Sequence, residues 1–324
     1  MKKSLFICTT ITVLLFCRCG NKNHNERVNS KEEVVEYYDY EDDRGNKGYI
    51  DKKGNVVINP QFDDANKFSE GLAAVKIGGK WGYVDKMGKY VINPQFDRAG
   101  DFSEGRAAIM MGDKWGYVDK TGKYIVNPQF DYAYEFSEGL AVVGIGELLT
   151  SKWGFIDKTG KYVINPQFDL ADGFSEGLAV VGIGEWGLMK FGYIDKKGKI
   201  VINPQFDEAD RFSEGLASVG IGEFETRKYG FIDKTGKYVI NPQFDGAGSF
   251  SEGLAYVGVG EFKTRKWGYV NKTGKLVINP QFKFADDFLG GWAFVSYESQ
   301  ENENGFRQGY IDKTGASVYT FVSK

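Results

Sequence analysis

The sequence predicts an all-β fold, built as a tandem array of about eight three-stranded antiparallel units joined by short helical-turn connectors. All seven prolines stand in the same four letters, NPQF, and they are Pro60, Pro94, Pro128, Pro166, Pro204, Pro242 and Pro280. They lie 34 residues apart twice and then 38 residues apart four times. A constant period of roughly 20 to 50 residues is typical of repeat proteins, whose units bury their apolar faces against one another. The 43 glycines and the 15% share of aromatic residues are typical of a turn-rich β protein.

The first 19 residues are typical of an export signal. A basic start is followed by an apolar run over residues 5–16, which is long enough for a signal peptide and too short to span a bilayer. The run ends near Cys17 and Cys19, and this arrangement resembles a bacterial lipoprotein signal, in which a cysteine is lipidated. Neither cysteine follows the usual small residue, so plain secretion is the alternative. We expect an extracytoplasmic protein of the bacterial cell envelope, with a lipid anchor as its only contact with the membrane.

Residues 20–33 are polar and rich in asparagine, which predicts a flexible tether. The array itself is expected over residues 34–324. The only histidine, His24, lies in the tether and is expected to be solvated and inert.

A β-hairpin forms the constant part of each unit. In KWGYVDKMGKYVI, the alternation of Trp81 and Tyr83 with smaller residues predicts a strand, and a second strand follows the DKMG turn. Asp85 can accept hydrogen bonds from the turn backbone, and Gly88 tolerates the left-handed conformation that closes a type I turn with a bulge. In one copy Asn271 replaces the aspartate and can act in the same way.

The segment after each hairpin is expected to leave the sheet. Pro94 has no N–H to donate to a strand partner, and the letters DRAGDFSEG then suggest one helical turn, with Asp97 as its N-cap and Gly105 at its left-handed end. A short apolar strand, usually LAVV, leads through a loop into the next Trp-Gly pair.

The two end units differ from the interior ones at the position before the glycine that recurs in every unit. Interior copies carry an aromatic residue there, as Trp81, Trp115, Trp153, Phe191, Tyr229 and Trp267. The first unit has Lys47 and the last has Gln308. Polar residues at both ends indicate caps and favour an open, curved array. Eight units would also suit a closed β-propeller, which is the alternative.

The phrases KWGYVDKTGKYIVNPQFD, at residues 114–131, and FSEGLAVV, at residues 136–143, resemble the bacterial WG repeat family. The resemblance extends from residue 46 to about residue 315. It implies a β-repeat of variable copy number, often in exported proteins, without an established general activity and with no catalytic residue to transfer. This chain departs from the pattern where Phe191 and Tyr229 replace the tryptophan, which fits a packing role for the ring.

The residue inventory argues against an enzyme. The array contains neither histidine nor cysteine, so it lacks the usual nucleophile pairs and zinc ligands. Its carboxylates recur in every copy as turn residues, whereas a catalytic pair is normally made once. We expect no cofactor and no metal. A net charge of -3 and a pI near 5.5 argue against nucleic acid as a partner.

Two function classes therefore remain. The first is a binding or scaffold module for another protein or an envelope polymer. The second is a carbohydrate-binding array that uses the repeated aromatic residues, although packing in the core is the simpler role for these rings.

One loop of the repeat varies while the rest stays constant. It is short in the first two interior units, KIGGK and MMGDK, and four residues longer in later copies. The longer loops carry Leu148, Leu149, Trp186, Leu188, Met189, Phe224 and Phe262. Flanking charges come from Glu147, Glu185, Glu223, Arg227 and Arg265. If the units stack in register, these apolar residues form a row, which we predict to be the partner surface. Alternatively, they cover one another on extended hairpins.

Overall fold

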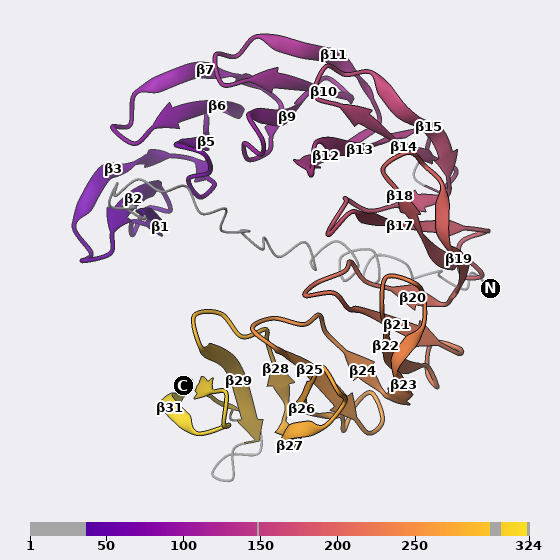
Figure 1. Ribbon diagram of the computed structural model, residues 1–324. Helices are drawn as coiled ribbons and strands as arrows, with labels where there is room; N and C mark the ends of the chain where they lie inside the picture. The colour runs from indigo at the N-terminus through magenta and orange to yellow at the C-terminus, as the bar shows by residue number, and fades with distance from the viewer. Residues whose placement is uncertain (1–36, 148, 299–305, 323–324) are drawn as a thin grey trace, which may run out of the picture. The chain divides into compact units, whose positions relative to one another are not determined.

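The computed structural model describes residues 37–147, 149–298 and 306–322 of the chain. Cys17, Cys19, Leu148 and the predicted signal peptide and tether lie outside these residues. Every regular element in the described part is a β-strand. The strands form eight antiparallel sheets, one per unit, in chain order from indigo to yellow in Figure 1. The first sheet has three strands and the other seven have four each.

Unit 1 comprises β1 (Tyr37–Glu41), β2 (Lys47–Asp51) and β3 (Val56–Phe62), and unit 2 comprises β4 (Asp64–Ala65), β5 (Leu72–Ile77), β6 (Lys80–Asp85) and β7 (Tyr90–Phe96). Unit 3 comprises β8 (Arg98–Ala99), β9 (Arg106–Met111), β10 (Lys114–Asp119) and β11 (Tyr124–Phe130), and unit 4 comprises β12 (Tyr132–Ser137), β13 (Leu140–Ile145), β14 (Lys152–Asp157) and β15 (Tyr162–Phe168). Unit 5 comprises β16 (Leu170–Ala171), β17 (Leu178–Ile183), β18 (Lys190–Asp195) and β19 (Ile200–Phe206), and unit 6 comprises β20 (Glu208–Ala209), β21 (Ala217–Ile221), β22 (Lys228–Ile232) and β23 (Tyr238–Phe244). Unit 7 comprises β24 (Gly246–Ala247), β25 (Leu254–Val259), β26 (Lys266–Asn271) and β27 (Leu276–Phe282), and unit 8 comprises β28 (Phe284–Ala285), β29 (Trp292–Glu298), β30 (Phe306–Asp312) and β31 (Ser317–Val322).

The sheets are separate, and the array is open. Among the described residues, no strand of one sheet pairs with a strand of another sheet. Within the described ranges, the strands of the first sheet and those of the last sheet pair only within their own sheets, so no shared strand closes the array into a ring. This confirms the all-β repeat array, in its open form and not as a closed propeller. Lys47 occupies the strand position of the interior aromatic residues, since it pairs with Phe62 as Trp81 pairs with Phe96.

The Asp-Lys-x-Gly turn closes each hairpin as predicted. Oδ1 of Asp119 accepts hydrogen bonds from the backbone N–H groups of Thr121 and Lys123, at 2.9 Å and 3.1 Å. The Thr121 hydroxyl donates to the same oxygen, and these bonds lower the pKa of Asp119 against the opposing effect of burial. Gly122 has a φ of 85°, in the left-handed region that favours glycine. The amide oxygen of Asn271 accepts the same set of bonds in its own turn.

The expectation that the chain leaves the sheet at the proline is wrong. In unit 3 the strand continues through Pro128, because Trp115 pairs with Phe130 while Tyr117 pairs with Val126. The extra residues form a bulge that presses on Gly116, where an added Cβ would lie 2.4 Å from the Val126 oxygen. The glycine after each aromatic residue is therefore required by close backbone approach within its own sheet.

The prediction of a helical turn in the connector is also wrong, since Ser-Glu-Gly forms a tight β-turn. Ser103 and Arg106 exchange both of their backbone hydrogen bonds, at 2.8 Å and 3.1 Å. The two residues between them, Glu104 and Gly105, have φ values of 52° and 79°. Asp97 does not cap a helix and instead accepts bonds from an adjacent loop, described below. The connector residues before the turn form the short strand β8, which makes the sheet four-stranded.

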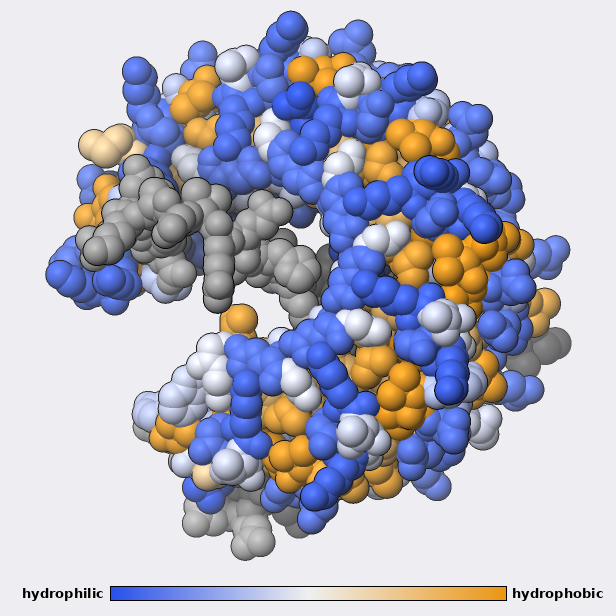
Figure 2. All heavy atoms as spheres, viewed as in Figure 1, coloured by the Kyte–Doolittle hydropathy of each residue, from blue (hydrophilic) through white to orange (hydrophobic). Residues whose placement is uncertain are grey.

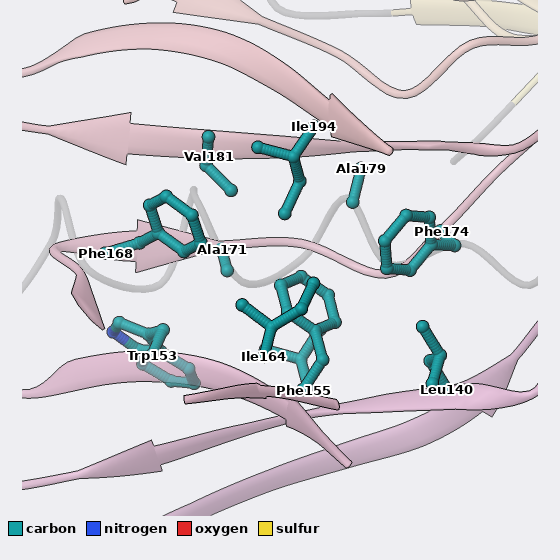
Figure 3. Packing of buried hydrophobic residues seen from close by; sticks show 11 residues of the cluster. Leu140, Trp153, Phe155, Ile164, Phe168, Ala171, Phe174, Ala179, Val181 and Ile194 are labelled. Carbon is teal, nitrogen blue, oxygen red and sulfur yellow. The ribbon is translucent and has the colours of Figure 1, made fainter. Parts of the chain in front are cut away.

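The hydrophobic core lies between consecutive sheets, so both faces of an interior sheet are buried. In unit 2, Tyr83 and Val84 point to opposite faces of one strand, yet both are fully buried. Figure 3 shows the cluster between units 4 and 5, where Phe155 from β14 and Phe174 from the next connector lie with their ring centroids 5.0 Å apart. Each unit is therefore stabilised mainly by its neighbours.

A ladder of polar contacts joins consecutive units along one edge, which we call the turn edge because the Ser-Glu-Gly and Asp-Lys-x-Gly turns meet there. The Glu176 carboxylate accepts a hydrogen bond from Gly215 N of the next unit at 3.0 Å and pairs with Lys234 Nζ at 3.1 Å. The Ser175 hydroxyl donates to the Phe212 carbonyl at 2.7 Å. The same carboxylate bond repeats from Glu70, Glu104, Glu138, Glu176, Glu214 and Glu252. These six glutamates have φ between 51° and 56°, a conformation unusual for a residue with a side chain.

Candidate partner-binding surface

The longer loops of units 4 to 7 lie at the opposite ends of the strands, which we call the loop edge. In each loop a β-turn forms the tip, with Leu188 N bonded to the Glu185 oxygen at 2.9 Å and Thr226 N bonded to the Glu223 oxygen at 3.0 Å. The turn places Trp186, Phe224 and Phe262 at its first central position in their respective loops. Figure 2 shows hydrophobic residues, in orange, reaching the surface among hydrophilic ones over several units.

One aspartate per unit fastens the bases of neighbouring loops together. Asp207 accepts a hydrogen bond from Lys190 Nζ of unit 5 at 2.5 Å and another from Gly222 N of unit 6 at 2.9 Å. Lys190 ends one loop and Gly222 begins the next. Burial acts to raise the pKa of Asp207, but these two bonds outweigh it and hold the pKa below its usual value. Consecutive loops therefore lie side by side at the loop edge.

The same fastener recurs along this edge. Asp97, Asp131, Asp169, Asp207 and Asp245 each pair with the lysine that precedes the aromatic residue of the unit before. Each also accepts a bond from the first glycine of the following loop. Sequence reasoning missed this role, although the constant aspartate after Gln-Phe was a visible signal.

The structure brings most of the predicted apolar residues to the surface of the loop edge. The exposed ones are Leu149, Trp186, Leu188, Phe224 and Phe262, with exposed fractions between 56% and 78%. Met189 is only half-buried and lies over Gly182, so it belongs to the sheet more than to the surface. The residues at the tips therefore do not bury one another.

A second set of apolar side chains extends this surface toward the sheets. The last residues of the strands that lead into the loops are Ile145, Ile183, Ile221 and Val259, and each is between 37% and 45% exposed. Sequence reasoning missed them because they end an apolar strand that was expected to be wholly buried. We call these four residues and the five exposed loop residues together the loop row.

The two predicted flanking arginines lie over the sheet and lend the surface little charge. Arg227 is half-buried and pairs with Glu208 at 2.6 Å, and the Tyr229 hydroxyl donates to the same carboxylate oxygen at 2.5 Å. Arg265 lies 5.7 Å from the Trp267 ring and 5.9 Å from the Phe262 ring, within the range of a cation–π contact. Both arginine side chains therefore pack on the sheet at the bases of their loops.

The six interior aromatic residues take part in packing. Trp153 is buried and tilts over Tyr132 and Tyr134, at centroid distances of 5.2 Å and 5.7 Å. Its ring also covers the opposite strand at Gly144, where an added Cβ would lie 3.1 Å from the indole. The other five rings are half-buried, at Trp81, Trp115, Phe191, Tyr229 and Trp267.

The described residues contain neither a membrane-spanning helix nor a metal-binding cluster. No helix there is long and apolar enough to cross a membrane. No group of three or more histidine, cysteine, aspartate or glutamate side chains in the described ranges is placed to hold a metal ion.

Several solved structures are similar to this chain in fold. A eukaryotic initiation factor is 10% identical, and the match covers 89% of this chain and 96% of that one, with a TM-score of 0.50. Kluyveromyces lactis Hsv2p is 9% identical over 81% of this chain and 97% of its own, with a TM-score of 0.45. A prolyl endopeptidase matches with a TM-score of 0.49, and the chain spans 49% of its length. At these identities the likeness to the initiation factor shows the fold alone.

Comparison with curated proteins gives no match. The model of one family, described as WG containing repeat, matches seven times, over residues 48–81, 81–115, 115–148, 153–185, 191–223, 229–261 and 267–299. These matches include the Trp-Gly strand, the Asp-Lys-x-Gly turn and the Ser-Glu-Gly turn described above. Because they cover most of the chain, this protein belongs to the WG containing repeat family.

Proposed function

We propose that this protein is an exported, lipid-anchored binding or scaffold module, which presents the loop row to another protein or to an envelope polymer. The observation that carries the proposal is the loop row itself. Its exposed apolar side chains come from four consecutive units, and the fastening aspartates hold their loops in register. A contiguous apolar surface of this kind usually marks an interaction site.

The contrast between constant and varied parts of the repeat supports the same proposal. The turns, the bulge and the core positions recur almost unchanged because each is required by packing or by a hydrogen bond. The loops differ in length and composition, and the fasteners at their bases involve only a lysine, an aspartate and a glycine N–H. The loop tips are thus free to vary without loss of the fold, as recognition loops on a rigid scaffold commonly are.

The proposed cellular location rests on the N-terminal sequence. The apolar run that ends near Cys17 and Cys19 supports export and lipidation at one of these cysteines. Metabolic labelling with a fatty-acid probe, in the wild type and in the Cys17→Ala and Cys19→Ala variants, tests this. We expect the label to be lost in one of the two variants. An unlabelled wild type would rule out the anchor.

We propose binding and no catalysis, because the acidic side chains most abundant in the array are engaged in turns, fasteners and the turn-edge ladder. Carbohydrate binding by the repeated aromatic residues is the second candidate. Packing of Trp153 and its counterparts in or beside the core gives these rings a structural role and lends that candidate less support. Binding to a glycan array that is lost on Trp115→Ala in a folded protein would favour it.

Capture from an envelope extract tests the loop row. The variant carries Trp186→Ser, Phe224→Ser and Phe262→Ser together, and we expect it to lose the captured partner while its melting temperature stays nearly unchanged. A matched control carries Val201→Ser, Val239→Ser and Val277→Ser, which are between 42% and 45% exposed on the outer strands. The control should retain capture, and the captured molecule should bind the purified wild type directly.

Equal loss of capture in both triple variants would contradict the proposal. So would a large fall in the melting temperature of the loop variant, because it would show that the three rings stabilise the fold.

A further inference from the structure

Each interior sheet buries one of its faces against the next unit. In unit 2 this face carries Leu72, Tyr83 and Ile92, which pack against the next unit and are all at most 8% exposed. The Tyr83 hydroxyl also donates to the Gly100 carbonyl of unit 3 at 2.7 Å. The face toward the next unit is thus made to pack on another sheet.

The corresponding face of unit 8 is aromatic and exposed, apart from Gln308 at the position of Trp81. Strand registers place Trp292 at the position of Leu72, Tyr310 at that of Tyr83 and Tyr319 at that of Ile92. These three side chains are between 44% and 63% exposed. A terminal unit that faces only water is expected to have a polar outer face. Here the residues at these positions are as large as, or larger than, their buried counterparts.

Further rings extend this uncovered face. Phe294 lies with its ring centroid 5.6 Å from that of Tyr310 and 6.2 Å from that of Phe284. Phe284 is itself exposed. We call Trp292, Phe294, Tyr310, Tyr319 and Phe284 together the tail face.

The outer face of the first unit corresponds to the side of an interior sheet that packs against the unit before it. In unit 2, Ala73 and Tyr90 pack against the unit before. Their counterparts in unit 1 are Tyr38 and Val56, which are 48% and 51% exposed. We call the outer side of the first sheet, marked by these two residues, the head face.

Among the described residues, the Ser-Glu-Gly contacts that join interior units do not extend beyond either end of the array. The last such contacts run from Ser251 and Glu252 to the connector of unit 8. Unit 8 itself has Leu289 and Gly290 at the serine and glutamate positions, so it has neither side chain for the next unit. The letters Ser-Glu-Gly do not occur in the sequence before Tyr37. A tail face on a head face would therefore leave no glutamate carboxylate or serine hydroxyl of the ladder unmatched.

We propose that the tail face of one molecule packs on the head face of a second copy, and so continues the array from one molecule to the next. The contact repeats the packing already present between consecutive units within the chain. It is heterologous, because two different faces meet, and so it can propagate beyond a dimer. This self-association is independent of the partner proposed for the loop row.

Sedimentation of the full chain in one mild detergent, over about a hundredfold range of concentration, tests the proposal. We expect the wild-type mass to rise with concentration. Tyr319→Asp blocks the tail face and Val56→Asp blocks the head face, so each variant alone should stay monomeric. An equimolar mixture should form a dimer and nothing larger, because one free tail face and one free head face remain. Val201→Asp, on an outer strand of unit 5, is the control and should associate like the wild type.

Three outcomes would overturn the proposal. The wild type stays monomeric throughout the range, the mixture of blocked variants stays monomeric, or a blocked variant associates by itself. Self-association of Val56→Asp alone would show that two tail faces meet. Circular dichroism and the melting temperature establish that each variant is folded, and Tyr319→Ser and Val56→Ser replace any aspartate variant that is not.

Discussion

The turn edge and the loop edge join the same units by different means. At the turn edge a glutamate in a left-handed conformation bonds a glycine N–H and a lysine of the next unit, and a serine hydroxyl bonds a carbonyl. At the loop edge one aspartate connects two loop bases, and the tips project beyond it. The turn edge repeats the same Ser-Glu-Gly turn in six consecutive units, whereas the loop edge varies in length and composition. The comparison indicates that one edge maintains the array, and it supports our proposal that the other serves recognition.

Two phenylalanines of unit 6 give the largest contrast. Phe212 precedes the Ser-Glu-Gly turn, is 1% exposed and packs on Tyr193 at 4.9 Å, whereas Phe224 lies at a loop tip and is 77% exposed. Phe212→Ala should lower the free energy of unfolding by about 3–5 kcal/mol, because it opens a cavity between sheets. Phe224→Ala should change it by less than about 0.5 kcal/mol. Denaturant unfolding measures both, and similar losses would contradict the distinction between the edges.

The ladder at the turn edge should give a smaller effect. Glu176→Ala removes the acceptor of Gly215 N and the partner of Lys234 while it keeps a side chain in the left-handed conformation. We expect a loss of about 1.5–2 kcal/mol, at the lower end of the range for a hydrogen bond to a charged group. Lys234→Ala is the matched control and should cost less than about 1 kcal/mol, because it removes only a partly exposed ion pair. A larger loss of unfolding free energy in the lysine variant would show that the ion pair, and not the hydrogen bond to Gly215 N, contributes most of the stabilisation.

The loop-edge fasteners predict a dependence on pH. The pKa of Asp207 is below its ordinary value in the folded protein, so its contribution to stability is complete above about pH 4 and is lost as the pH falls through the folded pKa. Asp207→Asn should lower the free energy of unfolding by about 1 kcal/mol at pH 7. The difference from the wild type should shrink below pH 4. A difference that stays constant down to acid pH would show that the charge of Asp207 is not the cause.

The smallest effect is expected for exchange of a whole loop. Replacing residues 184–189 with the Gly-Asp pair of unit 3 keeps a glycine N–H for the preceding aspartate, as Gly112 provides for Asp97. The free energy of unfolding should change by about 0.5 kcal/mol or less, because loop closure depends only weakly on length. Thermal unfolding checks this. A loss of several kcal/mol would mean that the long loop contributes to the core.

The features that could be predicted from the sequence depend on interactions between residues close together in the chain. The spacing of the prolines indicated the repeat and its period, and the turn at Asp119 formed as expected because its hydrogen bonds lie within four residues. The connector could not be predicted in the same way. Alone, Ser-Glu-Gly resembles the end of a helix, but Glu104 takes its conformation where a glycine N–H and a lysine of the next unit meet its carboxylate.

The residues of the candidate surface could likewise be predicted only in part. The change in loop length pointed to Trp186, Phe224 and Phe262, and the structure leaves all three exposed. The exposed strand ends were missed, because an apolar residue at the end of an apolar strand carries no sign of whether a neighbour covers it. Arg227 was expected to flank the row, but pairing with Glu208 draws it onto the sheet.

The sequence by itself determined the repeat, the hairpin turns, the position of the varied loop and the polar substitutions at Lys47 and Gln308. Each is written in a short segment whose conformation depends on nearby residues. Only the tertiary structure decided that consecutive loops lie side by side, that the interior rings pack beside glycines, and that Tyr319 stands uncovered at the position where Ile92 is buried. These features depend on contacts between residues of different strands or different units, whose free energy exists only once the sheets have formed and packed.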